Sequence, residues 1–226
     1  MNIEKDAERL FLIPNLTYDT TYDFYFLTED NALNLSTFSQ KINYKTKKLE
    51  DREFASDLFI SEYIEGSAYN KVIELFNYTG NNVDLSSYSL KRDGNSDGNF
   101  TDMSDDKSDK ELKLKGLLPH NKTLVIRYKR DDLHPYIKSI ADMSDDVATG
   151  VMAFSGEDPI ALFKNGIEID RIGIPGGIKF GADKTFVRKS FVKSGLIGPQ
   201  DPRTNGEWDQ YEKDTYYFLG GHTYDP

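Results

Sequence analysis

Apolar positions in this chain come in short runs in which β-branched and aromatic residues dominate. The runs are bounded by Asn, Gly, Asp and Pro, residues that favour turns. This spacing is typical of the strands of a sandwich or barrel and predicts an all-β fold with few helices. The expected strands lie at 58–64, 71–76, 88–91, 111–115, 123–128 and 185–189.

The dipeptide Asn165-Gly166 predicts a β-hairpin. It separates a continuous apolar run from an alternating run that contains Ile167 and Ile169, and Asn-Gly suits the type I′ turn that joins two such strands. Helix signals are restricted to residues 6–11 and 135–143, each long enough for one or two turns.

Two polar stretches interrupt the strand pattern. The first is charged and begins near residue 46, so we expect residues 49–57 to link an N-terminal part, 1–48, to a larger domain, 58–226. The second, at 93–109, holds six Asp and almost no apolar residue. It predicts an exposed excursion between two strands.

The net charge and the composition of the chain argue against several classes of partner and site. The 28 basic and 38 acidic residues give a net charge of -10, which repels phosphate backbones, so no nucleic-acid partner is expected. The absence of Cys removes disulfides, thiolate zinc sites and Cys nucleophiles. No run approaches the roughly 18 apolar residues of a spanning helix, and the N-terminus lacks a signal-peptide layout. We therefore expect no membrane insertion, while a cytoplasmic protein and a mature or excised piece of an exported one both remain compatible with the sequence.

The acidic stretch has a chemistry of its own. Oxygen-bearing side chains stand at positions 1, 3 and 5 of an EF-hand-like loop, and Gly98 stands at position 6. Position 12 is Ser104 instead of the bidentate Glu, so any Ca²⁺ site should be weak. Its candidate ligands are Asp93, Asn95, Asp97, Asp102 and Asp105. The alternative is a solvated loop, and no cofactor is required.

Common enzyme motifs are missing: the sequence has no GxSxG, GxxxxGK, GxGxxG or HExxH. We interpret His120, His134 and His222 as surface or capping residues, although a triad or a three-His metal site is the alternative. A glycosidase-like carboxylate pair has no framing motif. The sequence therefore predicts no catalytic residue.

A set of polar residues near the first two strands of the larger domain invites a catalytic interpretation. We instead expect the Asn residues to shape turns and the Glu residues to cap or pair across strands. The set comprises Glu62, Glu65, Asn70 and Glu74, and Asn77 is the other Asn expected to shape a turn.

The densest aromatic stretch lies near the C-terminus and either packs into the core or forms a sugar or peptide platform. We expect the single Trp and the Phe to pack, and some Tyr rings to stay exposed. The stretch contains Trp208, Tyr211, Tyr216, Tyr217 and Phe218.

Several motifs follow one another between residues 58 and 223. The run LFISEYIEGSAYNKVIELFNYTGNNVDLSSYSLKR at 58–92 is followed by LKLKGLLPHNKTLVIRY at 112–128 and FSGEDPIALFKNGIEIDRIG at 154–173. TFVRK, Glu-Trp and LGGHT close the series. In this order the motifs resemble the lamin tail domain, which implies an immunoglobulin-like β-sandwich.

The N-terminal part carries a second resemblance. Leu16, Thr20 and Tyr22 are spaced like the residues of a fibronectin type III tyrosine corner. The resemblance implies that residues 1–48 hold the last strands of such a module, as a β-hairpin remnant. Because an isolated hairpin is marginal in water, it should dock on the larger domain, pair with another chain, or have lost partners from a longer protein.

The lamin-tail resemblance implies a non-catalytic accessory or interaction domain. In bacteria, similar domains are typically attached to exported hydrolases, nucleases and surface proteins, so we expect an extracytoplasmic or cell-surface setting and a protein or surface-glycan partner. The similar domain of eukaryotic lamins also binds DNA through basic patches, which the charge of -10 argues against here. The alternative is a domain that supports, or contributes residues to, a hydrolase such as a nuclease or phosphoesterase on the same natural chain.

Overall fold

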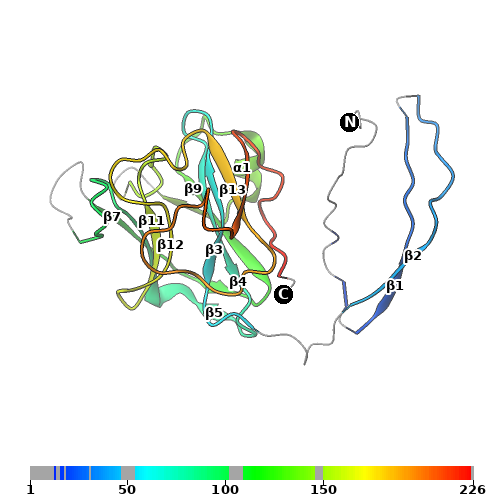
Figure 1. Ribbon diagram of the computed structural model, residues 1–226, viewed down its shortest axis with the longest axis horizontal. Coiled ribbons are helices and arrows are strands. Elements are labelled where there is room, and N and C mark those ends of the chain that lie inside the picture. Colours follow the sequence, from blue (N-terminus) through cyan, green and yellow to red (C-terminus); the bar gives the residue numbers. More distant parts are fainter. Residues whose placement is uncertain are drawn as a thin grey trace. The chain divides into compact units, whose positions relative to one another are not determined.

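The chain divides into two compact units, Met1–Glu53 and Phe54–Pro226. The computed structural model (Figure 1) describes residues 13, 16–17, 19–30, 32–46, 54–101, 109–145 and 150–224. The division falls within the stretch 49–57, for which the sequence predicts a linker.

The first unit contains a small antiparallel sheet of two strands, β1 (Thr21–Phe24) and β2 (Ile42–Lys45). Their register places Tyr22 opposite Tyr44. Beside this sheet, the backbone N–H of Thr17 donates a hydrogen bond of 2.7 Å to the Tyr22 hydroxyl. The expected N-terminal hairpin is therefore present.

The larger sheet of the second unit has six strands in the order β10-β9-β4-β3-β13-β14. All neighbours are antiparallel except β10, which runs parallel to β9. The strands in that order are Met143–Asp145, Lys122–Tyr128, Lys71–Asn77, Phe59–Glu65, Lys184–Arg188 and Trp208–Glu212.

A second sheet has the order β12-β11-β6-β7, and a short pair joins β5 to β8. The four strands are, in that order, Ile167–Ile172, Ile160–Lys164, Tyr88–Arg92 and Lys110–Lys113. The short pair consists of Val83–Asp84 and Leu117–Leu118, and a 3₁₀ turn, η2, spans Leu85–Ser87.

The main core lies between the two large sheets. Ile60 and Tyr63 of β3 pack in one buried cluster with Leu90 of β6 and Leu162 of β11. Burial of apolar side chains from both sheets in one cluster stabilises a two-layer sandwich, because each sheet removes the other's inner face from water.

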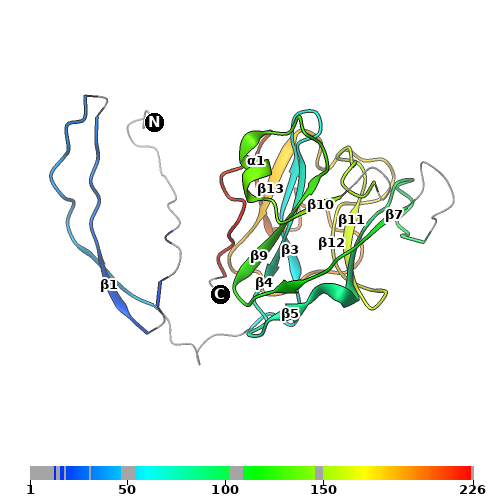
Figure 2. The ribbon, with the colours of Figure 1, turned by 180° about the vertical axis from the view of Figure 1, so that it is seen from behind.

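The other face of the six-stranded sheet is covered by helix α1 (Pro135–Ile140) and by residues 213–224, here called the C-terminal segment. Figure 2 shows both on the side away from β11 and β12. Ile137 of α1 and Leu219 of the segment share a buried cluster with Ile64 and Val72 of the sheet. This second layer of packing builds the surface on which the candidate site lies.

The strands predicted from the sequence are confirmed within one or two residues at each end. The hairpin at Asn165-Gly166 is also confirmed, and both turn residues have positive φ, 50° and 78°. This is the backbone conformation that a type I′ turn requires and that Asn and Gly tolerate best.

The prediction for residues 135–143 is wrong at its end. The helix stops at Ile140, and Met143–Asp145 form β10, because their backbone pairs with β9. The strand β14 (Trp208–Glu212) begins at the Glu-Trp motif that resembles one of the closing strands of the lamin tail domain, and it adds to the sheet beside β13. The predicted helix at 6–11 lies outside the described residues.

Candidate functional site

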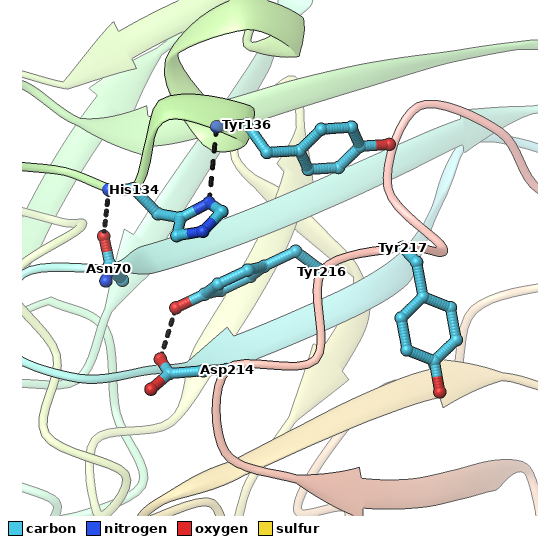
Figure 3. A pocket seen from close by; sticks show the side chains of 6 residues that line it. All are labelled: Asn70, His134, Tyr136, Asp214, Tyr216 and Tyr217. Carbon is cyan, nitrogen blue, oxygen red and sulfur yellow. Dashed lines mark hydrogen bonds between the residues drawn. The ribbon is translucent and has the colours of Figure 1, made fainter. Parts of the chain in front are cut away.

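A surface cavity of about 600 Å³ lies between α1 and the C-terminal segment (Figure 3). Residues from three places in the chain line it. One precedes β4, two come from the start of α1, and three follow β14. The lining residues are Asn70, His134, Tyr136, Asp214, Tyr216 and Tyr217.

Asp214 holds one wall of the cavity in place. Its carboxylate accepts hydrogen bonds from the backbone N–H and the hydroxyl of Ser67 and from the hydroxyl of Tyr216. Burial acts against the charged form of Asp214, but the bonds from Ser67 and Tyr216 outweigh it and lower the pKa of this carboxyl. Burial and the bond to Asp214 raise the pKa of the Tyr216 hydroxyl, so the wall is a carboxylate beside a neutral phenol.

His134 lines the cavity beside Tyr216. Its backbone N–H donates to Asn70 Oδ1 at 2.8 Å, and its Nδ1 accepts the N–H of Tyr136 at 3.3 Å, which caps α1. Pro135 occupies the first helical turn, where its missing N–H costs nothing. Because Nδ1 accepts a hydrogen bond, the neutral tautomer of the ring carries its proton on Nε2, as a donor.

Aromatic rings supply the remaining surface. The rings of His134 and Tyr216 lie 4.8 Å apart between centroids, with an interplanar angle of 34°. Tyr136 is 38% exposed and donates its hydroxyl to the carbonyl of Leu219 at 3.3 Å, whereas Tyr217 is 71% exposed. The cavity thus combines exposed ring faces with a carboxylate, an amide and an imidazole donor, which is the composition of a binding site for a small polar ligand.

Two carboxylates lie beneath the C-terminal segment. Glu62 and Glu74 face each other across β3 and β4, and each is 1% exposed. Glu74 accepts hydrogen bonds from Ser61 Oγ at 2.6 Å and from the N–H of Gly220 at 2.7 Å. Glu62 Oε1 has no hydrogen-bond partner in the described part of the chain.

Burial dominates the protonation of these groups. Burial raises the pKa of Glu74 to about 7, and burial together with the nearby Glu74 raises the pKa of Glu62 well above its usual range. The imidazole of His222 lies edge-on to Phe76, with centroids 5.0 Å apart. Burial, and then the charge of Arg188, lowers the pKa of His222 to about 3.

These shifts predict how stability depends on pH. A carboxyl with a raised native pKa contributes stability below its unfolded pKa and loses that contribution as pH rises through the native pKa. We expect Glu62→Gln to raise the free energy of unfolding at pH 8 by roughly 1–3 kcal/mol and to change it little at pH 4.5. Neutral His222 has the opposite effect on the pH dependence of stability. Its contribution to the free energy of unfolding is present above about pH 6.5 and is lost as the pH falls towards 3. Urea unfolding at several pH values measures these differences.

The matched control is Glu212→Gln, because the Glu212 side chain is 88% exposed on β14. It should leave the pH profile unchanged. If the free energy of unfolding depended on pH in the same way in the parent and in Glu62→Gln, Glu62 would not be a buried carboxyl with a raised pKa.

The histidines lie at separate places in the fold. His120 Nδ1 accepts the N–H of Gly80 at 3.1 Å, His134 caps α1, and His222 packs against aromatic rings. Within the ranges that the structure describes, no three His, Asp or Glu side chains lie close enough to hold a metal ion.

The polar residues of the first two strands behave differently from one another. Asn77 shapes a turn, accepting the N–H of Thr79 at 3.0 Å, and Glu65 pairs across strands with Lys71. The backbone of Asn70 bonds within its own turn, to Ser67 and Gly66, but its side-chain oxygen accepts the backbone N–H of His134. Glu62 lies opposite Glu74 across β3 and β4, and its Oε1 has no hydrogen-bond partner among the described residues, so this cross-strand neighbour does not stabilise its charge.

The acidic loop is held by its own amides. Asp93 is fully buried, and its two carboxylate oxygens accept the N–H groups of Asp97, at 3.2 Å, and Gly98, at 2.8 Å. Asn95 Oδ1 accepts the same N–H of Asp97, at 3.1 Å, and Asp97 accepts the N–H of Asn99 at 2.8 Å. A cation would have to compete with these donors for the oxygens.

The remaining candidate ligands, Asp102 and Asp105, lie outside the described residues. The calcium interpretation predicts a dissociation constant on the order of 10⁻⁴ to 10⁻³ M, which at about 10 mM calcium stabilises the fold by roughly 1.4–2.7 kcal/mol. Thermal melts with calcium, with magnesium and with chelator test it. The shift should vanish in the double variant Asp93→Ala with Asp97→Ala, and identical parent melts would leave the stretch as a solvated loop.

The C-terminal aromatic stretch splits as expected between packing and exposure. Trp208 is buried and Phe218 half-buried, while Tyr217 is exposed. The sequence analysis did not single out Asp214 and Tyr136, which line the cavity with Tyr217. Tyr136 reaches this segment only through the fold, since it and its acceptor Leu219 are 83 residues apart.

The two packed sheets of the second unit define an immunoglobulin-like β-sandwich. A family model described as Lamin Tail Domain matches residues 53–176, more than half of the chain. The chain therefore belongs to the lamin tail domain family, whose members are typically non-catalytic domains. No curated protein matches the chain.

The family match ends before β13, yet β13 pairs with β3, with Thr185 opposite Ile64. Residues beyond the match thus complete the sheet and supply half of the cavity. The match leaves residues 1–52 without an assigned family and gives no support for a fibronectin type III module. Among the described residues, no helix has the length and apolar character to cross a membrane.

Proposed function

We propose that this chain is a non-catalytic interaction domain of a larger exported or cell-surface bacterial protein and that it binds a protein or glycan partner. The observation that carries the proposal is the cavity beside α1, where Tyr136 and Tyr217 present rings to solvent around fixed polar groups. The lamin tail family supports a non-catalytic role. The net charge of -10 disfavours a nucleic-acid partner.

The competing function is a domain that contributes residues to a hydrolase. The carboxylates with the largest pKa increases, Glu62 and Glu74, are each 1% exposed under the C-terminal segment. A general acid or base must lie within hydrogen-bond reach of its substrate. Their burial therefore favours the interaction domain over the hydrolase.

Turnover assays on nucleic acids, glycans, phosphoesters and peptides test this function. We expect no turnover above background from the purified chain. Turnover that is lost in Glu74→Gln or His222→Ala, while both variants remain folded by circular dichroism, would contradict the proposal and identify a hydrolase.

We also propose that residues 1–48 are the last strands of a fibronectin type III-like module. Two observations support it: the antiparallel pairing of β1 with β2, and the hydrogen bond from the N–H of Thr17 to the Tyr22 hydroxyl, which resembles a tyrosine corner. Thr46 Oγ1 donates to the carbonyl of Thr17 at 2.6 Å and so ties the end of β2 to the same loop.

A further inference from the structure

We propose that the cavity beside α1 binds a neutral pyranose unit of a glycan. This inference rests on the proposed interaction function and names the ligand class of its site. The cavity volume of about 600 Å³ accommodates one or two sugar rings, and its mouth is open to solvent, as the end of a longer glycan requires.

The exposed rings match the apolar faces of a pyranose. Tyr217 is 71% exposed at the edge of the cavity, and its ring lies 4.5 Å from that of Phe218, between centroids, which restricts its rotation. Tyr136 stands on the other side, fixed by its hydroxyl bond to Leu219 (Figure 3). Rigid tyrosines provide amphipathic contact area at low entropic cost, since only two torsions need to be held.

The polar groups match vicinal hydroxyls. Asp214 is an acceptor, and the Nε2–H of His134 is a donor with no protein partner in the described structure. Asn70 adds its amide nitrogen beside the Tyr216 hydroxyl, since its oxygen is held by the N–H of His134. A sugar hydroxyl both donates and accepts, so a wall that alternates acceptor and donor groups satisfies it in either role.

A cationic ligand suits these walls less well. The Asp214 carboxylate is charged and accepts three hydrogen bonds, two from Ser67 and one from Tyr216, which leaves one of its roughly four acceptor positions for a ligand. The neighbouring His134 has its Nδ1 acceptor occupied by the N–H of Tyr136, so a neutral ring offers a ligand a donor N–H. A cation would pair with the carboxylate and leave the donor without a partner, whereas a hydroxyl-bearing neutral polyol can pair with both.

Titration of the complete chain with tetrasaccharides of glucose, N-acetylglucosamine and mannose tests the inference, with binding followed by calorimetry and by NMR shifts. We expect at least one of these neutral sugars to bind. Tyr217→Ala should weaken it by about tenfold, and Tyr217→Phe, which keeps the ring, should bind nearly as the parent does. Phe191→Ala is the matched control, because Phe191 is 55% exposed and does not line the cavity.

Each outcome separates the two proposals. If none of the three sugars binds, or if binding is equal in the parent and Tyr217→Ala, the sugar site is wrong and the non-catalytic function stands. Tetramethylammonium that binds in a Tyr217-dependent manner would replace the sugar site by a cation site. Cleavage of a bound tetrasaccharide, detected in the same samples, would contradict the non-catalytic function and leave the sugar site in place.

Discussion

Arg188→Met lowers the free energy of unfolding by about 3–5 kcal/mol, as expected when one partner of a buried ion pair is removed. Arg188 Nη2 lies 3.0 Å from Asp170 Oδ1, and the two side chains are 1% and 0% exposed. Without the guanidinium, Asp170 remains buried with its charge unpaired. Urea unfolding of the parent and the variant measures the loss.

Backbone hydrogen bonds to Asp170 increase the loss of stability that is expected when Arg188 is removed. Asp170 also accepts the N–H groups of Ile60, at 2.7 Å, and of Leu196, at 2.9 Å, so its carboxylate joins β3 and a later loop to β12. Burial raises the pKa of Asp170 and the charge of Arg188 opposes that increase. Removing Arg188 therefore favours protonation of Asp170, which weakens the hydrogen bonds that it accepts.

The matched control is Arg203→Met. Arg203 also pairs with an aspartate, at 2.7 Å from Asp201, but its side chain is 39% exposed. Exposed pairs contribute about 0.2–1 kcal/mol, so the control should lose no more than that. Equal losses in Arg188→Met and Arg203→Met would contradict the buried-pair argument.

Trp208→Ala has the second large effect, an expected loss of about 3–5 kcal/mol from lost transfer energy and the cavity left behind. Trp208 is 5% exposed and belongs to the main core at the start of β14. The guanidinium carbon of Arg188 lies 4.5 Å from the centre of its ring, so the loss includes a cation–π contact. Chemical denaturation measures it.

Because Trp208 is the single Trp, its fluorescence reports on its own environment. Native emission should be blue-shifted and should move to the red on unfolding. Phe191→Ala, at an exposed ring, should change stability by about 0.5 kcal/mol or less. A native spectrum that is already red-shifted, with unchanged stability in Trp208→Ala, would place the ring at the surface.

The sequence predicted the elements that depend on neighbouring residues. The hairpin at Asn165-Gly166 follows from the positive φ of its two turn residues, a local property. The strands follow from short β-branched and aromatic runs between turn residues. The helix predicted at 135–143 extends beyond the observed one, because residues 143–145 form β10 by pairing with β9, and their own sequence does not indicate that pairing.

The sequence predicted only some of the residues of the candidate site. The aromatic stretch and His134 stood out by residue type, but their roles depend on contacts between distant parts of the chain. Asn70 meets His134 across 64 residues, and Glu74 meets Gly220 across 146 residues. The spacing of residues along the chain does not predict such contacts, because they form only when β4, α1 and the C-terminal segment pack together.

The sequence alone thus determined the all-β class, the lamin-tail resemblance and the positions of the main strands, because period, turn chemistry and ordered motifs are properties of adjacent residues. Only the tertiary structure decided which polar side chains are buried and which face solvent. Glu62 and Tyr217 show this most clearly, the first hidden beneath the C-terminal segment and the second open at the cavity. Burial depends on the packing of whole layers, and it turns one residue into a determinant of stability and the other into a contact for a ligand.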